Sequence, residues 1–421
     1  MEPAVRTLQP VRGTRDILPA EMRRHRAVAQ TARRVAAQYG YAEMATPVFE
    51  FTDVFKRTLG EHSDVVMKEM YTFPVSEEGD TVTLRPEGTA GFARAYITNG
   101  LQQNLPLKAF YTGPMFRHER PQKGRLRQFH QVGVELLGPG RPVADVEIIA
   151  MGQQLLTELG LGGSIALELN TLGDLESRKA YRAALVEYFE AHTDRLSEDS
   201  RHRLHRNPLR ILDSKDEGDQ AVVADAPAFG DYLNQHSRDF FGEVCEGLDA
   251  LGIDYRLNPR LVRGLDYYCH TCFEFTTTAL GAQGTVLAGG RYDDLIETMG
   301  GPATPGTGWA AGIERLAMLM DRDTTPTRPI AVVPAGAEAE TSALRLTQDL
   351  RRQGFTVDMG YSGNMKKRLK RANNAGACAA VILGGDELAA NIATVRDLDT
   401  GEQETVALDR VAAYLTSYQP G

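Results

Sequence analysis

The sequence feature that most constrains the fold is a pair of β-rich stretches whose alternate positions carry charged side chains. The pair lies between Phe116 and Glu135, and a short loop rich in Arg, Gln, Lys and Gly joins the two stretches. Alternate side chains of a strand share one face of a sheet, and here these positions are Arg117, Glu119, Gln131, Gly133 and Glu135. Such a face cannot be buried without polar partners. The pattern predicts either a solvated hairpin or the floor of a pocket for a charged ligand, with the basic loop placed to meet phosphates.

A second polar cluster lies in the segment Thr83–Thr89, at the start of a helix predicted over residues 89–98. Glu87 and Thr89 stand where side chains commonly cap the first turn of a helix. Both capping and ligand binding therefore fit these two residues.

A third cluster places two charges and two tyrosines in a strand that is otherwise apolar. Its members are Arg263, Asp266, Tyr267 and Tyr268. A buried arginine needs an anionic partner. That partner is either Asp266 or the carboxylate or phosphate of a ligand.

A glycine-rich region follows, and its segments Gly289–Asp293 and Gly306–Arg315 let the backbone approach another group closely. The G-x-G-x-x-x-G spacing differs from the dinucleotide-binding fingerprint and lacks the strand–helix–strand context of that motif. The sequence contains no Gly-Lys-Ser or Gly-Lys-Thr, so it has no Walker A loop. These observations argue against a nicotinamide enzyme and against a P-loop enzyme.

Cysteine usage argues for a reducing compartment, because four cysteines are too few for a disulfide scaffold. Cys269 and Cys272 have the spacing of a metal-binding pair. In a strand, however, such positions point to opposite faces, so we expect them to pack as ordinary side chains. The first 19 residues lack the apolar core of a signal peptide, and no apolar run is long enough to span a membrane. We therefore expect a cytoplasmic location without membrane contact.

The length of 421 residues predicts more than one domain. We expect a β-rich first domain over residues 1–325, interrupted at about 171–255 by a mostly helical insertion. A polar, Pro-containing linker follows it. Strands and helices then alternate over 326–421, ending in a helix at 406–418, which predicts an α/β domain with a largely parallel sheet.

The formal net charge is −9, which does not exclude RNA as a partner, because binding depends on where Lys and Arg cluster. Lys366–Arg371 opens a helix predicted over 365–375 with a strong basic patch. This patch is either a solvated helix face or a contact with phosphates.

Together these clusters resemble the motifs of histidyl-tRNA synthetases, a family of class II aminoacyl-tRNA synthetases. Gly13–Pro19 is similar to the N-terminal signature of that family, and Thr46-Pro47 resembles motif 1, which lies at the dimer interface of class II enzymes. The segments that carry the rest of the resemblance are Phe116–Glu135 for motif 2, Arg263–Tyr268 for the histidine-specific segment and Gly306–Arg315 for motif 3. The resemblance covers nearly the whole chain from about Val11.

The resemblance implies an α+β catalytic domain with an antiparallel sheet and flanking helices, an insertion that contacts tRNA, a C-terminal anticodon-binding domain and a homodimer. It also implies that the chain activates L-histidine with ATP and Mg²⁺ and transfers histidine to tRNA(His).

The roles that the resemblance implies fall into three groups. The residues that meet histidine are Glu87, Thr89 and Gln131 at its α-amino end, Glu135 and Tyr268 at its imidazole, Arg263 at its carboxylate, and Tyr267 and Tyr292 in the pocket wall. The residues that meet ATP are Arg117 at the α-phosphate, Glu119 near the adenine and Mg²⁺, and Arg315 near the tail, with Arg117, Arg263 and Arg315 as the catalytic set. The residues that meet tRNA are Arg120, Gln122, Lys123 and Arg125 at the acceptor end, and Lys366, Lys367 and Arg371 in the C-terminal domain.

Physical chemistry agrees with this arginine-rich set. The nucleophile of the first step is the carboxylate of the substrate, which is already ionised at pH 7, so the step needs no protein base. It needs two anions to be aligned, and it needs the charge that develops on the α-phosphate to be stabilised. A site that hydrogen-bonds both ring nitrogens of histidine would also reject other amino acids without an editing domain.

Four residues depart from what the family commonly carries: Cys269, His270, Cys272 and Trp309. They adjoin the predicted site but replace none of the residues named above. The strongest rival interpretation is a synthetase-like paralogue without catalytic activity, such as the regulatory subunit of ATP phosphoribosyltransferase. Such paralogues lack the C-terminal domain, which this chain keeps. A plain RNA-binding module would leave the polar strands unexplained.

Overall fold

The computed structural model describes residues 7–60, 65–76, 79–122, 124–212, 214–262, 265, 267–281, 284–321 and 325–419. The chain divides at residue 324 into two compact units. Three residues that the sequence analysis singled out, Lys123, Arg263 and Asp266, lie outside the described residues.

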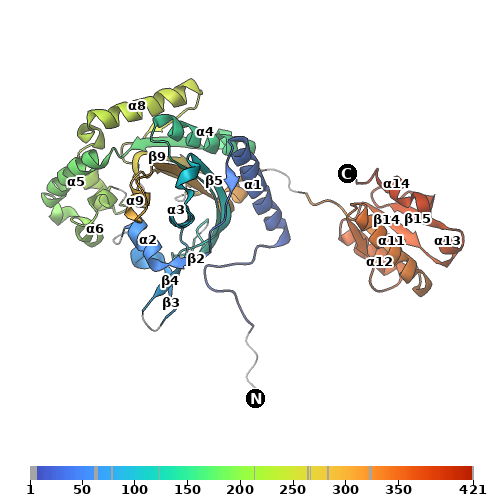
Figure 1. Ribbon diagram of the computed structural model, residues 1–421. Helices are drawn as coiled ribbons and strands as arrows, with labels where there is room; N and C mark the ends of the chain where they lie inside the picture. The colour runs from blue at the N-terminus through green and yellow to red at the C-terminus, as the bar shows by residue number, and fades with distance from the viewer. Residues whose placement is uncertain are drawn as a thin grey trace, which may run out of the picture. The chain divides into compact units, whose positions relative to one another are not determined.

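The first unit is built on an eight-stranded sheet that curves around a helix, α3 (Figure 1). The order of its strands is β1 (Ala42–Glu43), β5 (Leu107–Phe116), β6 (Gln128–Leu137), β11 (Gly306–Gly312), β10 (Thr285–Arg291), β9 (Cys269–Thr276), β7 (Ala166–Thr171) and β8 (Arg256–Leu257). The six central strands, from β5 to β7 in this order, are antiparallel to one another. The edge strand β1 pairs in parallel with β5, and the edge strand β8 pairs in parallel with β7. The expected antiparallel sheet is therefore confirmed.

Long helices cover the outer face of this sheet (Figure 1). They are α1 (Pro19–Gln38), α4 (Pro142–Glu158) and α8 (Gln235–Ala250), and the shorter α10 (Ile313–Leu319) packs against α1. The buried residues of α1 recur every three or four positions, as in Val28, Ala32 and Val35, so one stripe of the helix faces the core.

The inner face carries a second core, formed with α2 (Thr52–Leu59), α3 (Thr89–Thr98) and α9 (Leu295–Thr298). Tyr96, Tyr292 and Phe55 are the largest of its fully buried side chains. The polar clusters predicted from the sequence lie beside this core.

A small three-stranded antiparallel sheet stands next to α2, in the order β2 (Phe49–Phe51), β4 (Thr81–Leu84) and β3 (Tyr71–Pro74). A π-helical turn (Val65–Glu69) and a 3₁₀ turn (Leu101–Asn104) lie in the connections nearby. The sheet exposes Phe49, Phe51 and Phe73. These aromatic rings leave a large apolar surface uncovered in the single chain.

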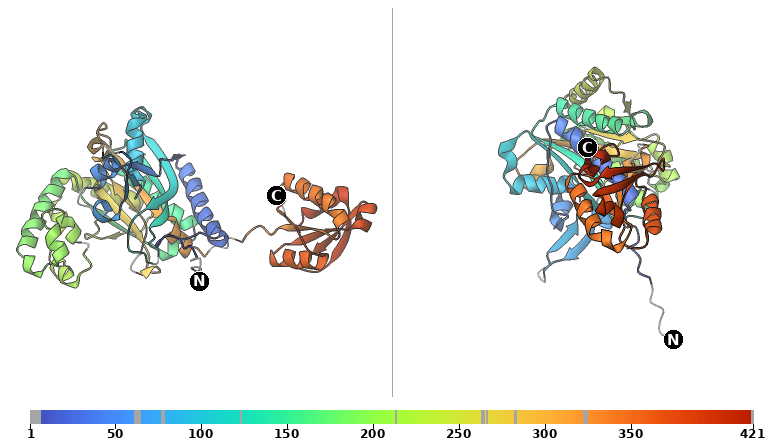
Figure 2. Two further views of the ribbon diagram at one scale, coloured as in Figure 1. Left: turned by 90° about the horizontal axis from the view of Figure 1, so that it is seen from below. Right: turned by 90° about the vertical axis from the view of Figure 1, so that its right-hand side faces the viewer.

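Between β7 and β8 the chain forms a group of helices that lies beside the sheet (Figure 2). Its elements before α8 are α5 (Leu175–Glu190), α6 (Glu198–Arg203) and α7 (Glu217–Val223), with 3₁₀ turns at Thr193–Arg195, Pro208–Ile211 and Phe229–Tyr232. Four helix starts carry a side-chain cap, from Asp174, Ser197, Asp216 and Asn234. The helices from α5 to the last 3₁₀ turn enclose a hydrophobic cluster of their own, centred on Leu185, Phe189 and Ile211.

The second unit is an α/β domain with a five-stranded sheet. Its elements are β12 (Ile330–Pro334), α11 (Glu340–Arg352), β13 (Val357–Met359), α12 (Met365–Asn374), β14 (Ala379–Leu383), α13 (Gly385–Ala389), β15 (Ile392–Asp397), β16 (Gln403–Ala407) and α14 (Val411–Leu415). Strands β13, β12 and β14 are parallel, and β15 and β16 extend the sheet in antiparallel fashion.

Two elements differ from the sequence prediction. The sequence analysis interpreted segment 306–312 only as a glycine-rich stretch whose backbone can approach another group closely. In the structure it is the central strand β11, because the strands β6 and β10 on its two sides supply hydrogen-bond partners that local propensity does not reveal. The helix predicted over 406–418 is wrong at its start, since β16 takes residues 403–407 and α14 begins at Val411. A mostly exposed edge strand gives no apolar alternation from which to predict it.

The pair Cys269 and Cys272 lies at the start of β9, where the register with β10 shifts and His270 adopts a positive φ of 42°. The Sγ of Cys269 accepts a hydrogen bond from the backbone N–H of Asp293, whereas the Sγ of Cys272 faces the carbonyl oxygen of Leu261. The two thiols thus have different surroundings, and a bulge rather than a regular strand separates them.

None of the described helices is both long enough and apolar enough to cross a lipid bilayer.

Candidate active site

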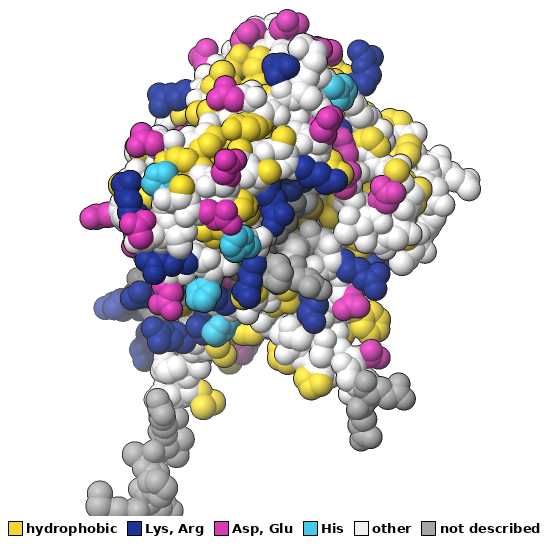
Figure 3. All heavy atoms as spheres, turned by 90° about the vertical axis from the view of Figure 1, so that its left-hand side faces the viewer, with side chains coloured by type: hydrophobic (Ala, Val, Ile, Leu, Met, Phe, Trp, Pro, Cys, Tyr) yellow, Lys and Arg dark blue, Asp and Glu magenta, His cyan; other side chains and the backbone are white. Residues whose placement is uncertain are grey.

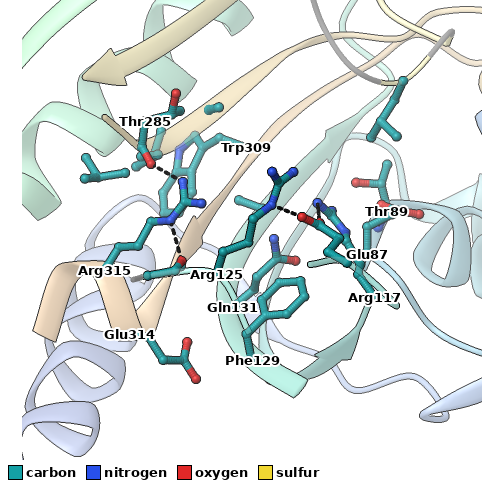
Figure 4. Close-up of a pocket in the computed structure, with 18 of the residues that line it drawn as sticks. Glu87, Thr89, Arg117, Arg125, Phe129, Gln131, Thr285, Trp309, Glu314 and Arg315 are labelled. Atoms are coloured by element: carbon teal, nitrogen blue, oxygen red, sulfur yellow. Dashed lines mark hydrogen bonds and ion pairs between the residues drawn. The ribbon is translucent and has the colours of Figure 1, made fainter. Parts of the chain in front are cut away.

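A cavity of about 200 Å³ opens between the start of α3 and the strands β6, β10 and β11 (Figure 4). Its walls bring together residues that are far apart in the sequence. The predicted site residues among them are Glu87, Thr89, Arg117, Glu119, Arg125, Gln131, Tyr267, Tyr268 and Arg315.

Glu87 caps a helix and also lines the cavity. Its carboxylate accepts backbone hydrogen bonds from Thr89 N at 2.6 Å and from Ala90 N at 2.8 Å, so it caps the first turn of α3. The same side chain lines the cavity. Burial raises the pKa of the Glu87 carboxyl, and the backbone donors oppose this shift.

Glu135 lies behind the cavity wall on β6, almost completely buried. Thr89 Oγ1 donates a hydrogen bond to Glu135 Oε1 at 2.7 Å, and the hydroxyl of Tyr292 donates to Oε2. Burial raises the pKa of Glu135 to about 8, although both hydroxyl donors act in the opposite direction. On β11, Gly308 leaves room for this carboxylate, because a Cβ at that position would lie 2.2 Å from Oε2.

Tyr111 is a buried residue of the site that the sequence analysis did not assign. It lies on β5 directly opposite Gly133 of β6, and a Cβ on Gly133 would lie 2.3 Å from its ring. Burial, followed by the charges of Glu135 and Glu87, raises the pKa of the Tyr111 hydroxyl. The glycine between Val132 and Val134 of β6 was the sequence signal for this close approach.

Three arginines face the cavity. Arg117 donates through Nε to the carbonyl oxygen of Pro86 at 2.9 Å and stacks over the ring of Phe129 at 5.3 Å. Arg125 forms an ion pair with the buried carboxylate of Glu119.

The third arginine, Arg315 at the start of α10, donates to the carbonyl oxygens of Gly124 at 3.0 Å and of Thr285 at 2.6 Å. Burial lowers the pKa of its guanidinium, and the nearby charges of Arg125 and Arg117 lower it further. The guanidinium groups therefore create a positive potential inside the cavity, which favours an anionic ligand.

At the α3 end the cavity is polar and aromatic. Gln131 Oε1 is buried, and it has no hydrogen-bond partner among the described residues. The ring of Tyr267 packs against those of Tyr268 and Tyr292, with centroids 4.6 Å and 5.8 Å apart. This end offers acceptors and ring faces, whereas the end near Arg315 offers cations.

Comparison with known proteins places this geometry in a family. The family model described as histidyl-tRNA synthetase matches residues 13–316. The chain belongs to the histidyl-tRNA synthetase family. A relative from Rhodospirillum rubrum named histidine--tRNA ligase is 64% identical over 98% of this chain and 99% of its own length. A relative of the same name from Gluconacetobacter diazotrophicus is 57% identical over 97% of this chain and 98% of its own length.

The solved structures agree with this membership of the histidyl-tRNA synthetase family. The apo histidyl-tRNA synthetase of S. aureus superposes with a TM-score of 0.81 at 36% identity, covering 97% of this chain and 99% of that chain. A second family model, described as an anticodon binding domain, matches residues 329–418 of the second unit. A Bacillus halodurans chain described as an ATP phosphoribosyltransferase regulatory subunit/histidyl-tRNA synthetase has a TM-score of 0.64 at 20% identity, and this likeness shows a shared fold alone.

The remaining residues predicted from the resemblance to histidyl-tRNA synthetases lie in several places. Glu135 and Tyr292 are buried behind Thr89 rather than in the cavity wall. Arg120 and Gln122 are exposed on the loop after β5, whereas Arg125, predicted to meet tRNA with them, points into the cavity. In the second unit, Lys366, Lys367 and Arg371 are exposed on α12, while Arg368 of the same basic run is buried and donates to Pro334 O.

Sequence reasoning also missed Glu314, the residue before Arg315. Its carboxylate turns away from the guanidinium groups of Arg125 and Arg315 (Figure 4) and accepts hydrogen bonds from the backbone N–H of His130 at 2.9 and 3.0 Å. At this point β6 extends beyond the end of β11, since Gly312 pairs with Gln131. Glu314 therefore takes the place of the missing strand neighbour and fixes the start of α10.

Proposed function

We propose that this chain is a histidine–tRNA ligase, which activates L-histidine with ATP to histidyl-adenylate and pyrophosphate and then transfers histidine to the 3′ end of tRNA(His). The observation that carries this proposal is the division of one cavity into an arginine-lined end and a polar, aromatic end. Such a cavity suits a nucleotide at the first end and an amino acid at the second.

The amino-acid end fits the groups of histidine. Gln131 Oε1 needs a donor, and together with Glu87 and Thr89 it provides the acceptors that a substrate ammonium group requires. We assign Tyr268 and the buried Glu135 to the recognition of the imidazole, and Tyr267 and Tyr292 to the packing around it. Arg263, which lies outside the described residues, keeps its proposed contact with the carboxylate as an inference from the family alone.

The nucleotide end fits the first chemical step. Arg117 and Arg315 are held by backbone carbonyl groups, so their charges are oriented before substrate binds. Preorganised donors of this kind stabilise charge that develops on a transferring phosphoryl group. They also align the two anions that must react. We therefore assign Arg117, Arg263 and Arg315 to catalysis and Glu119 to the adenine side.

Magnesium accompanies ATP in this proposal. Mg²⁺ prefers oxygen ligands, and one or two carboxylates together with the phosphates of a substrate commonly hold it. Glu119 is a buried carboxylate at the cavity wall, so the donor set fits this arrangement. When bound, the ion would neutralise part of the phosphate charge.

Several surfaces support tRNA as the second substrate. A groove beside the insertion is lined by Lys68, His202, Arg203, Arg206 and Arg210, with Asp199 as its acidic member. Lys, Arg and His side chains gather on this side of the molecule (Figure 3). We propose that the insertion at about 171–255 and the exposed Arg120 and Gln122 contact the acceptor arm. Lys366, Lys367 and Arg371 would then contact the anticodon side from the domain over 326–421.

We further propose that the chain works as a homodimer in the cytoplasm. The exposed rings of Phe49, Phe51 and Phe73 on the small sheet form the kind of apolar surface that a second copy commonly covers. This sheet adjoins Thr46-Pro47, the segment that resembles motif 1.

Histidine-dependent exchange between ATP and pyrophosphate tests the proposed function. Folded protein should support exchange with L-histidine and with none of the other nineteen amino acids at a comparable rate. Folded protein that supports no exchange would favour the second candidate, a non-catalytic regulatory paralogue. The match of the C-terminal anticodon-binding model argues against that candidate.

A further inference from the structure

Beside the cavity, two histidines and the cavity-lining Glu314 come together from three different elements. His25 lies on α1, His130 on β6 and Glu314 at the start of α10, and one ligand atom of each lies within 4.8 Å of the other two. The proposed function uses neither histidine.

The contacts of His25 leave one ring nitrogen unexplained. Its side chain is 4% exposed, and its buried Nε2 has no hydrogen-bond partner among the described residues. Glu21 Oε1 lies 3.7 Å from this nitrogen, beyond hydrogen-bonding distance. A buried polar atom without a partner is costly, so this nitrogen calls for a ligand.

The other two residues are already held together. His130 Nδ1 lies 2.9 Å from Glu314 Oε1, and the backbone N–H of His130 fixes the same carboxylate. Glu314 is 5% exposed, and its second oxygen accepts only that backbone donor among the described contacts. The rings of His25 and His130 meet edge to face with centroids 5.9 Å apart.

The charge around the cluster is mixed. Glu314 and Glu21 are the acidic groups that face His25, and Arg15 is the basic group, paired with Glu21. Burial lowers the pKa of His25, which favours the neutral imidazole.

We propose that His25, His130 and Glu314 bind one transition-metal dication, with Zn²⁺ as the best match. Two imidazoles and one carboxylate form a donor set that Zn²⁺ commonly takes in proteins, with a fourth position left to water or another carboxylate. Mg²⁺ prefers oxygen ligands alone, so this site differs in chemistry from the one proposed for the nucleotide.

Metal binding would require a modest local contraction. Ligand atoms about 2.0–2.2 Å from a tetrahedral ion lie roughly 3.3–3.6 Å from one another. The distance of 2.9 Å between His130 Nδ1 and Glu314 Oε1 is shorter than that range and would widen slightly, whereas the widest separation in the cluster is at most 4.8 Å and would shorten. The required shift is thus confined mainly to the side chains of the buried cluster.

The consequence is structural. An ion at this place would join α1, β6 and α10, and the last two elements carry Gln131 and Arg315. It would therefore brace the scaffold of the cavity without itself lying among the substrates.

The test is calorimetric titration of the full chain with Zn²⁺ after treatment with a chelator, in the absence of ATP, histidine and tRNA. We expect the wild type to bind one Zn²⁺ at a site whose affinity falls at least ~10-fold in His25→Ala. His202→Ala, which removes an exposed histidine from the insertion, is the matched control and should bind as the wild type does. Co²⁺ bound at the same site should give a visible absorption band that His25→Ala lacks.

A second variant separates metal binding from folding. His25→Gln keeps a polar side chain of similar length, and we expect Zn²⁺ to raise the unfolding temperature of the wild type but not that of this variant. Equal Zn²⁺ affinity in the wild type and both His25 variants would assign binding to another group, such as Cys245, and would overturn the proposal. Absence of any stoichiometric binding would reduce the cluster to a set of hydrogen bonds. Neither outcome depends on whether the chain aminoacylates tRNA.

Discussion

Thr89 Oγ1 donates a hydrogen bond of 2.7 Å to Glu135 Oε1, and this contact joins the first turn of α3 to the centre of the large sheet. The other carboxylate oxygen accepts from Tyr292. Burial nevertheless outweighs both donors and raises the pKa of Glu135 to about 8. The carboxyl group behind the cavity is therefore largely neutral at pH 7 when no substrate is bound.

This raised pKa predicts a dependence of stability on pH. Between the usual value of 4.5 and about 8, the unfolded chain loses the proton of Glu135 while the folded chain keeps it. The free energy of unfolding should therefore fall as pH rises through this window, by up to about 1.4 kcal/mol per pH unit from this group. Glu135→Gln, which cannot ionise, should flatten the profile.

Urea unfolding at a series of pH values measures this effect. Glu187→Gln, which changes an exposed glutamate on α5, serves as the control and should follow the wild-type profile. Parallel profiles for the wild type and Glu135→Gln would show that Glu135 ionises normally in the folded chain.

Two arginines of one loop should affect different steps, Arg125 the activation of histidine with ATP and Arg120 the binding of tRNA. Arg125 faces the cavity beside Glu119, whereas Arg120 is exposed. We expect Arg125→Ala to slow histidine-dependent ATP–pyrophosphate exchange by on the order of 10²-fold. Arg120→Ala should leave exchange within about twofold and weaken tRNA binding instead. Equal losses in both assays for both variants would contradict this division of the loop.

The glycine beside Glu135 gives a steric prediction. A Cβ at Gly308 would lie 2.2 Å from Glu135 Oε2 and 2.4 Å from the carbonyl oxygen of Val134. Gly308→Ala should therefore lower the free energy of unfolding by about 1–3 kcal/mol and raise the KM for histidine. At Gly163 a Cβ meets nothing within 4 Å, so Gly163→Ala should leave both quantities unchanged. A Gly308→Ala protein as stable and active as the wild type would show that the strands can separate here.

The basic face of α12 gives a prediction for tRNA. Replacing Lys366, Lys367 and Arg371 together by Ala should weaken tRNA binding and flatten its dependence on salt, because fewer phosphate contacts release fewer counterions. Exchange of pyrophosphate should not change. Arg345→Ala on α11 removes one exposed charge elsewhere in the same domain and is the control. If the salt dependence of tRNA binding is unchanged in the triple variant, this face of α12 is solvated and does not contact phosphates.

The sequence predicted the elements with strong periodicity closely. The helix expected over 89–98 is α3 (Thr89–Thr98), and the helix expected over 365–375 is α12 (Met365–Asn374). In both cases the local signals agree with the tertiary environment. The central strand β11 escaped prediction because glycines dominate it, and its partners β6 and β10 come from distant parts of the chain.

Prediction from the sequence was limited in the same way at the candidate site. Alternation along β6 predicted that Gln131 and Glu135 share a face, but only packing puts Gln131 in the cavity wall and Glu135 behind it. The sequence also could not show that Arg125 turns inward while Arg120 remains exposed, because both lie in one basic loop. Glu314 escaped notice because its partner, His130, belongs to a strand that it meets only after folding.

The two roles of Glu87 limit which substitutions this chain can accept at that position. Because one carboxylate both caps α3 and lines the cavity that we propose binds histidine, a replacement of Glu87 that alters the cavity also removes the cap of a buried helix. Amino-acid choice and foldability are thus coupled at one position. Variants designed to accept a new amino acid should keep Glu87 and change the aromatic side chains of the cavity wall instead.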